Sequence, residues 1–388
     1  MESAALTAPL AGSAGGTASH PGGKPWATTA DPAWQTLAAW VRGRRFGGLA
    51  LPLGAGPDYV FQVSDADGVY VIDAGRREVI GLVEGAESAG GVAADPNGRR
   101  VYVSNPARST LDVIDFKTLA VFKRIPLSGR PSDVASSKDG SKIYVGVEQG
   151  AVDVIDSASL TRVNTIALGG PVAGVFSTPD GTHLIAVSPE SPILTVLDLD
   201  REAISWTLKL DANIEPAVAF VPNGDGSTRD ILFQLQGLRG FAVVDFATRT
   251  EMTRIHFPAG PGRDRKALST LSGGGIVVSS NLDYPNERML WTADQAEDSV
   301  VAFGVPERCY PRRTLQPGER CDWEVLGSVE VGAGPSSLTP APDSKTIYVA
   351  VSDADQTAAI DVAKMTVVDR VPVGRDPGRN LAATMKAN

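Results

Sequence analysis

Apolar and polar residues alternate over short runs along most of the chain, and one five-residue run recurs with an aspartate at its end. It reads VYVID at 69–73, LDVID at 111–115, VDVID at 152–156, LTVLD at 194–198, FAVVD at 241–245 and TAAID at 357–361. SVVAF at 299–303 takes the corresponding place in one further unit, with Phe303 where the aspartate would stand. Alternation with a period of two is typical of a β-strand. The pattern therefore predicts seven strands of one kind.

Three other series accompany these strands. A second strand-like run precedes each of them: YVFQV at 59–63, VYVSN at 101–105, IYVGV at 143–147, LIAVS at 184–188, ILFQL at 231–235, LWTAD at 290–294 and IYVAV at 347–351. Turns such as DPNG at 95–98 and TPDG at 178–181 link it to an earlier apolar run, and a fourth run such as VNTIAL at 163–168 closes the unit. Four short runs in each of seven units of about 40 to 60 residues predict an all-β fold, a seven-bladed β-propeller of four-stranded blades.

The order of the runs also predicts how the ring closes. The first unit begins at Tyr59 with a run of the second type, whereas GRNLAATMK at 378–386 has the form of a first-type run. We therefore expect the C-terminal strand to enter the first blade as its innermost strand, beside residues 59–64. No sheet edge would then be left unpaired.

The repeated aspartate has two possible roles. At the end of a strand its carboxylate can accept backbone N–H groups of the following turn. Alternatively, the aspartates could form a ring of catalytic or metal-binding groups. The structural role is favoured, because a residue repeated in every unit usually serves the repeat.

Composition and charge narrow the class of protein. The chain has 388 residues and a net charge of -9, and it lacks the basic clusters on which phosphate binding relies, so a nucleic-acid surface is not expected. No apolar run approaches the roughly 18 residues that span a bilayer. Residues 1–16 lack the basic start and apolar stretch of a secretory signal.

Two cysteines occur, and they bracket the insert CYPRRTLQPGERC. A disulfide between Cys309 and Cys321 that closes this loop is the favoured interpretation, with two free thiols as the alternative. A disulfide would indicate an oxidising compartment, either the periplasm or the extracellular space.

Residues 57–388 resemble the YVTN family of seven-bladed propellers. The resemblance is carried by DVASSKDGSKIYVGV, AVDVIDSASLTRVNTIALGG and SLTPAPDSKTIYVAV. It implies the propeller fold for the domain at 51–388. It implies little about function, because members of the family are adhesive, redox-associated or unassigned, and related propellers are lactonases.

Residues 1–50 differ from the rest and form a separate N-terminal extension. Three of the six tryptophans lie there, at Trp26, Trp34 and Trp40. ADPAWQTLAAWVRG predicts a helix over 32–42, with Asp31 as its N-cap and Pro32 at its first position.

Part of this extension resembles the C-terminal part of a c-type cytochrome domain. The resemblance is carried by ESAALTAPLAGSAGG, HPGG at 20–23 and DPAWQTLAAWVRG. The chain contains no CxxCH, so covalent haem attachment is not expected unless the native protein extends upstream through such a motif. The segment would then belong to a longer product or be a remnant. Alternatively, it is an extension whose aromatic residues dock on the propeller.

Few residues suggest catalysis. The only histidines are His20, His183 and His256, and the last two fall near predicted strands, where a structural role is favoured. The chain has no HExxH, GxSxG or phosphate-binding loop. No catalytic residue is therefore assigned, and no cofactor is expected in this chain apart from a possible Ca²⁺.

Loops that gather at one mouth of the propeller channel carry the candidate ligand-binding residues. Entry loops to the first-type strands contribute Arg130, Glu215, Arg263, Arg265, Lys266 and Arg379, and the second-to-third loop of unit six adds Asp294, Glu297 and Asp298. The second-to-third loops of units one and seven contribute Asp65, Asp67, Asp353 and Asp355 as a candidate calcium site. The alternative is a set of solvated loop charges.

Two classes of function remain open. The first is an extracytoplasmic propeller, not catalytic by itself, that binds a protein partner, such as a redox protein, or a small polar ligand. The second is an enzyme subunit, either lactonase-like or of the amine-dehydrogenase large-subunit type with its cofactor on another chain. The first class is favoured because the catalytic motifs are missing.

Overall fold

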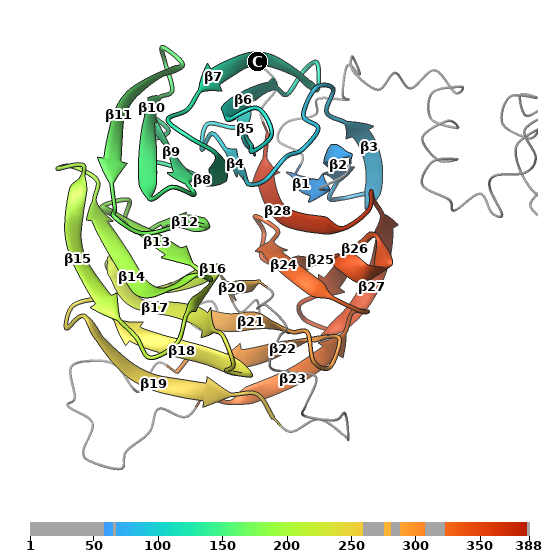
Figure 1. The fold of residues 1–388 in the computed structure, drawn as a ribbon. Coiled ribbons are helices and arrows are strands. Elements are labelled where there is room, and N and C mark those ends of the chain that lie inside the picture. Colours follow the sequence, from blue (N-terminus) through green and yellow to red (C-terminus); the bar gives the residue numbers. More distant parts are fainter. Residues whose placement is uncertain (1–57, 65–66, 259–274, 281–287, 307–322, 386–388) are drawn as a thin grey trace, which may run out of the picture.

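The computed structural model describes residues 58–64, 67–258, 275–280, 288–306 and 323–385 of the chain. Within them, 28 strands form seven separate four-stranded antiparallel sheets arranged as blades around a central axis (Figure 1). The prediction of a seven-bladed β-propeller is confirmed. A 3-10 helix, η3 (Ser352–Ala354), lies between two strands of the last blade. The helix predicted over 32–42 and the cysteines Cys309 and Cys321 lie outside the described residues.

The blades follow one another along the chain, and the first is completed by the last strand. Blade 1 contains β28 (Pro377–Thr384), β1 (Asp58–Ser64), β2 (Gly68–Asp73) and β3 (Glu78–Leu82); blade 2 contains β4 (Val92–Ala94), β5 (Arg100–Asn105), β6 (Thr110–Asp115) and β7 (Ala120–Pro126). Blade 3 contains β8 (Pro131–Ser136), β9 (Lys142–Val147), β10 (Ala151–Asp156) and β11 (Thr161–Ala167); blade 4 contains β12 (Gly174–Ser177), β13 (His183–Ser188), β14 (Ser191–Asp198) and β15 (Ala203–Lys209).

The three remaining blades have the same order of strands, with the innermost strand first. Blade 5 contains β16 (Ile214–Pro222), β17 (Thr228–Leu235), β18 (Gly240–Asp245) and β19 (Thr250–His256). Blade 6 contains β20 (Ile276–Ser280), β21 (Arg288–Asp294), β22 (Ser299–Gly304) and β23 (Val325–Glu330), and blade 7 contains β24 (Pro335–Pro340), β25 (Thr346–Val351), β26 (Gln356–Asp361) and β27 (Thr366–Pro372). Across the described residues, no helix has the length and apolar character needed to cross a membrane.

Each blade buries both of its faces against its neighbours. In β10, Val152 and Val154 belong to a core cluster shared with blade 4, whereas Ile155 belongs to the cluster shared with blade 2. Seven such clusters occur in the described residues, one at each interface between adjacent blades. The alternation in the sequence therefore serves two hydrophobic interfaces rather than one buried face and one solvated face.

The ring closes through β28, as the order of the runs predicted. This strand pairs antiparallel with β1, so that Tyr59 lies opposite Ala383 and Phe61 lies opposite Leu381. Met385, just beyond β28, is fully buried in the cluster between blades 1 and 2. The pairing covers the inner edge of β1 that would otherwise be exposed.

The recurrent aspartate caps the turn from the third strand to the outer strand. Its Oδ1 accepts a backbone N–H two or three residues later in six blades, from Arg76, Lys117, Ser159, Asp200, Thr248 and Lys364. These backbone hydrogen bonds are the main reason that the pKa values of Asp156 and Asp361 are lowered. In blade 6 the predicted equivalent was wrong by one residue, because Phe303 pairs with Leu290 as Ile360 pairs with Ile347 in blade 7, and Gly304 takes the place of the aspartate. Phe303 packs edge-on against Phe241, with ring centroids 5.3 Å apart. The predicted turn role is confirmed.

A second set of aspartates holds the turns between the first and second strands. Asp180 accepts hydrogen bonds from Thr178 and Thr182 of its own turn and from the backbone N–H of Thr228 in blade 5 at 3.1 Å. Burial acts to raise the pKa of Asp180, but these hydrogen bonds outweigh it and lower the pKa to about 2. Ionised Asp180 therefore links blade 4 to blade 5.

Lowering the pH should remove the contribution of Asp180 to stability. Because its folded-state pKa of about 2 lies below the unfolded value of about 3.9, the contribution is complete above about pH 4 and is lost as the pH falls towards 2. We expect Asp180→Asn to lower the free energy of unfolding by about 1 kcal/mol at pH 7 and by much less at pH 2.5. Urea unfolding at both pH values measures this. Glu190→Gln is the matched control, since Glu190 is exposed and should give no difference at either pH.

Removing residues 377–388 should abolish cooperative unfolding of the ring. The deletion exposes the inner edge of β1 and removes Met385 from the core cluster between blades 1 and 2. The loss of this buried apolar surface should lower the free energy of unfolding by several kcal/mol. Thermal unfolding followed by circular dichroism measures the effect. A sharp transition at the full-length midpoint would contradict the role of β28 in closure.

Candidate functional site

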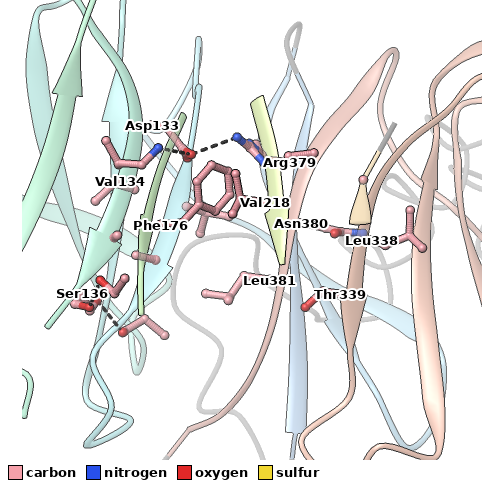
Figure 2. A pocket seen from close by; sticks show the side chains of 18 of the residues that line it. Asp133, Val134, Ser136, Phe176, Val218, Leu338, Thr339, Arg379, Asn380 and Leu381 are labelled. Atoms are coloured by element: carbon pink, nitrogen blue, oxygen red, sulfur yellow. Dashed lines mark hydrogen bonds and ion pairs between the residues drawn. The ribbon is translucent and has the colours of Figure 1, made fainter. Parts of the chain in front are cut away.

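The innermost strands of all seven blades line a central cavity of about 340 Å³. Each of these strands contacts the innermost strands of the two adjacent blades, which makes the wall continuous. The lining combines many small and branched apolar side chains with a few polar ones (Figure 2). Those that matter for chemistry are Asp133 and Ser136 from β8, Phe176 and Ser177 from β12, Thr339 from β24, and Arg379 and Asn380 from β28.

Arg379 reaches from the closing strand to three other blades. Its Nη2 donates to Asp133 Oδ2 at 2.9 Å in blade 3 and to the Pro216 carbonyl oxygen at 2.6 Å in blade 5. Its guanidinium carbon lies 5.3 Å from the centroid of the Phe176 ring in blade 4, a cation–π geometry. The closing strand therefore supplies a cation that joins blades 1, 3, 4 and 5 within the channel (Figure 2).

Asp133 is almost completely buried, with 5% of its surface exposed. Burial raises the pKa of its carboxyl group, while Arg379 and the backbone N–H groups of Val134 and Val175 act in the opposite direction. The Val175 N–H donates to Oδ2 at 3.2 Å. Gly91 of blade 2 leaves the room that this carboxylate needs, because a Cβ there would lie 2.3 Å from Asp133 Oδ1.

The other polar groups of the cavity are used within its wall. Ser136 Oγ donates to the Ala94 carbonyl at 2.8 Å, and Ser177 Oγ donates to the Ser136 carbonyl at 2.9 Å. Thr339 Oγ1 accepts the Ala382 N–H at 3.0 Å. These bonds join neighbouring inner strands, so the three hydroxyl groups are engaged within the wall.

The proposed rim residues separate into two groups in the structure. Arg379 and Glu215 lie on innermost strands, and Glu215 is 1% exposed in β16, next to the Pro216 that contacts Arg379. Arg130 lies at the start of blade 3, where its Nε is 3.2 Å from Glu148 Oε1 in an exposed ion pair. Arg263, Arg265 and Lys266 lie outside the described residues.

Blades 1 and 7 are neighbours, and their second-to-third loops both reach the segment that leads into β28. Asp67 Oδ2 lies beside Gly374, where a Cβ would come within 2.2 Å, and Asp355 Oδ1 accepts the Asp376 N–H at 3.1 Å. Burial and Asp67 raise the pKa of Tyr70 to about 12. Asp353 is exposed, and Asp65 is outside the described residues. In the part of the chain that the structure describes, no three His, Cys, Asp or Glu residues are grouped as metal ligands.

Sequence reasoning missed two features of this face. Asp133 takes the place in DVAS that glycine takes in GVAA at 91–94 and GVFS at 174–177, and this single departure was the available signal. Asp294 of the acidic loop in unit six is neutralised by Arg239 of blade 5, whose Nη2 lies 2.5 Å from Asp294 Oδ2. Nothing in the local sequence identified that arginine as its partner.

The chain matches no protein-family model and no curated protein. Its structure is similar to solved propellers. Hydrazine synthase of Kuenenia stuttgartiensis is 19% identical with a TM-score of 0.60, covering 76% of this chain and 90% of that chain. The dihydro-heme d1 dehydrogenase NirN is 16% identical with a TM-score of 0.58, and the match covers 90% of this chain and 76% of that chain. A proposed 6-phosphogluconolactonase of Bacteroides fragilis is 15% identical with a TM-score of 0.63, and the match covers 84% of this chain and 98% of that chain. At these identities the likeness shows the fold alone.

Calcium binding by Asp65, Asp67, Asp353 and Asp355 stays a prediction. Four carboxylates on adjacent loops could supply several of the six to eight oxygen ligands that calcium takes, and a bound cation would relieve their mutual repulsion. Millimolar calcium should then raise the melting temperature, and the double variant Asp65→Asn with Asp353→Asn should lose that increase. A melting temperature that responds neither to calcium nor to chelator would contradict the site.

Proposed function

We propose that this propeller is a binding and assembly module of an extracytoplasmic redox system, that it acts beside a c-type cytochrome, and that it catalyses no reaction by itself. The observation that carries the proposal is that two solved propellers with this fold are named for redox chemistry, hydrazine synthase and the dehydrogenase NirN. The resemblance of residues 1–43 to the end of a c-type cytochrome domain supports the same context.

The construction of the ring suits an assembly role. Every blade is fixed between two hydrophobic interfaces, so the loops of each face are held on a rigid frame. The face that carries the second-to-third loops presents the exposed carboxylates of Asp353 and Asp355. Together with a net charge of -9, these groups would steer a partner with a basic surface to that face.

The alternative is an enzyme subunit. The buried carboxylate of Asp133 and the guanidinium of Arg379 provide an acid–base group and an anion-binding group in the channel, and Glu215 is buried in β16, one of the strands of its wall. The solved structure named as a proposed 6-phosphogluconolactonase makes lactone hydrolysis the reaction to test first. A large subunit of amine-dehydrogenase type would instead require a second chain that carries the cofactor.

Affinity capture from the native host tests the proposal. The immobilised chain should retain a protein that carries covalent haem, detected by haem staining and identified by its CxxCH peptide. Reversing charge with Asp353→Lys and Asp355→Lys should reduce the captured haem at least tenfold and weaken its dependence on salt. The control variant, Glu78→Lys with Asp200→Lys, changes the same charge in turns on the opposite face and should retain full capture.

Two results would contradict the proposal. One is the absence of any haem protein above the level of an empty matrix. The other is hydrolysis of a lactone by the purified chain that is lost in Arg379→Met, since this would establish the enzymatic alternative.

A further inference from the structure

Among the described residues that line the central channel, Arg379 is the one cationic group, and it has hydrogen-bond donors to spare. Nη2 of Arg379 uses its two N–H bonds on Asp133 and on the Pro216 carbonyl. Among the residues that the structure describes, Nε and Nη1 of this side chain have no hydrogen-bond partner. The side chain is 27% exposed and lines the cavity, so these remaining N–H groups are accessible from it. The guanidinium therefore offers a ligand three further donors in a fixed plane.

The acceptors that could compete for these donors are already used. Asp133 Oδ2 accepts from Arg379 and from the Val175 N–H, and the carboxylate is packed against Gly91. The hydroxyl groups of Ser136 and Ser177 donate to backbone carbonyls of adjacent blades. A ligand that enters the channel must therefore bring its own acceptors to Arg379.

Below Arg379 the wall combines apolar side chains with the hydroxyl groups of Ser136, Ser177 and Thr339, which form hydrogen bonds within the wall. Leu381 follows two residues later on the same strand, and Val218 of β16 and Leu338 of β24 also line the cavity (Figure 2). Val218 and Leu338 are buried, and Phe176 packs under the guanidinium. One end of the channel thus favours an anion, and the rest favours hydrocarbon.

We propose that the channel binds a small organic carboxylate. The carboxylate accepts hydrogen bonds from Nε and Nη1 of Arg379, and the hydrocarbon part lies against Val218, Leu338 and Leu381. A cation is disfavoured by the charge of Arg379, and an uncharged hydrocarbon leaves the Arg379 donors unpaired. This ligand site does not depend on the redox partner proposed above.

The size of the cavity limits the ligand. A volume of about 340 Å³ is at the lower end of the roughly 300 to 1,000 Å³ typical of ligand pockets. Octanoate, with a single carboxylate and a short unbranched chain, is therefore a suitable probe. Octan-1-ol is the matched neutral probe, because it keeps the chain and removes the charge.

Asp133 positions Arg379 but also opposes the ligand. Its carboxylate fixes the guanidinium towards the channel, and its negative charge repels a second carboxylate placed on the same arginine. Asp133→Asn keeps an acceptor next to Arg379 and removes that repulsion. A carboxylate ligand should consequently bind the variant more tightly, a result that a purely structural ion pair would not give.

Isothermal titration calorimetry with octanoate and octan-1-ol tests the proposal on the full chain. Wild type should bind octanoate at least tenfold more tightly than octan-1-ol. Arg379→Met should lower the affinity for octanoate at least tenfold and leave the affinity for octan-1-ol unchanged. Asp133→Asn should raise the affinity for octanoate about threefold. Leu381→Trp, which fills the cavity, should abolish binding of both probes.

Circular dichroism melting identifies variants that are not folded. If Arg379→Met does not fold, the octanoate affinities of Asp133→Asn and Leu381→Trp test the proposal. The proposal is overturned by equal affinity for octanoate and octan-1-ol, by no binding of octanoate to wild type, or by unchanged octanoate affinity in the folded variants.

Discussion

The whole structure depends on one constraint: each four-stranded blade has two apolar faces and can bury them only between two other blades. The seven core clusters each combine residues of adjacent blades, as Val152 and Leu184 do for blades 3 and 4. An isolated blade would expose both of its faces, because it would lose the apolar contacts with both neighbouring blades. The first and last blades also bury their apolar faces against each other, through Val60 and Ile72 of blade 1 and Tyr348 of blade 7. The ring therefore has to close.

Closure also creates the candidate site. The strand that completes blade 1 is the last described strand of the chain, and it is an inner strand whose residues Arg379, Asn380 and Leu381 line the channel. Arg379 is thereby brought to Asp133, which lies 246 residues earlier, and to the Pro216 carbonyl of a third blade. A buried ion pair of this kind contributes little net stability compared with apolar packing. Its guanidinium faces the cavity, and the proposed carboxylate site makes use of that position.

Local patterns were sufficient to predict the architecture. LDVID at 111–115 became the third strand β6, residues 378–386 entered blade 1 close to the predicted limits, and Asp156 caps the turn to the outer strand. The candidate site was harder to predict from the sequence, because its contacts join blades that are distant in sequence. Arg379 and Glu215 could be assigned to the channel end of inner strands from the repeat register. The pairing of Arg379 with Asp133, and of Asp294 with Arg239, depends on the rotation between blades, which a repeat pattern does not encode.

Native-state amide hydrogen exchange tests the central claim, that β28 is an integral strand of blade 1 and not an appended terminus. If β28 is integral to blade 1, its amides that bond to β1 exchange only by global unfolding, as slowly as those of β10 in the middle of blade 3. Exchange of β28 at the rate of a frayed chain end, while β10 remains protected, would contradict closure of the ring by this strand.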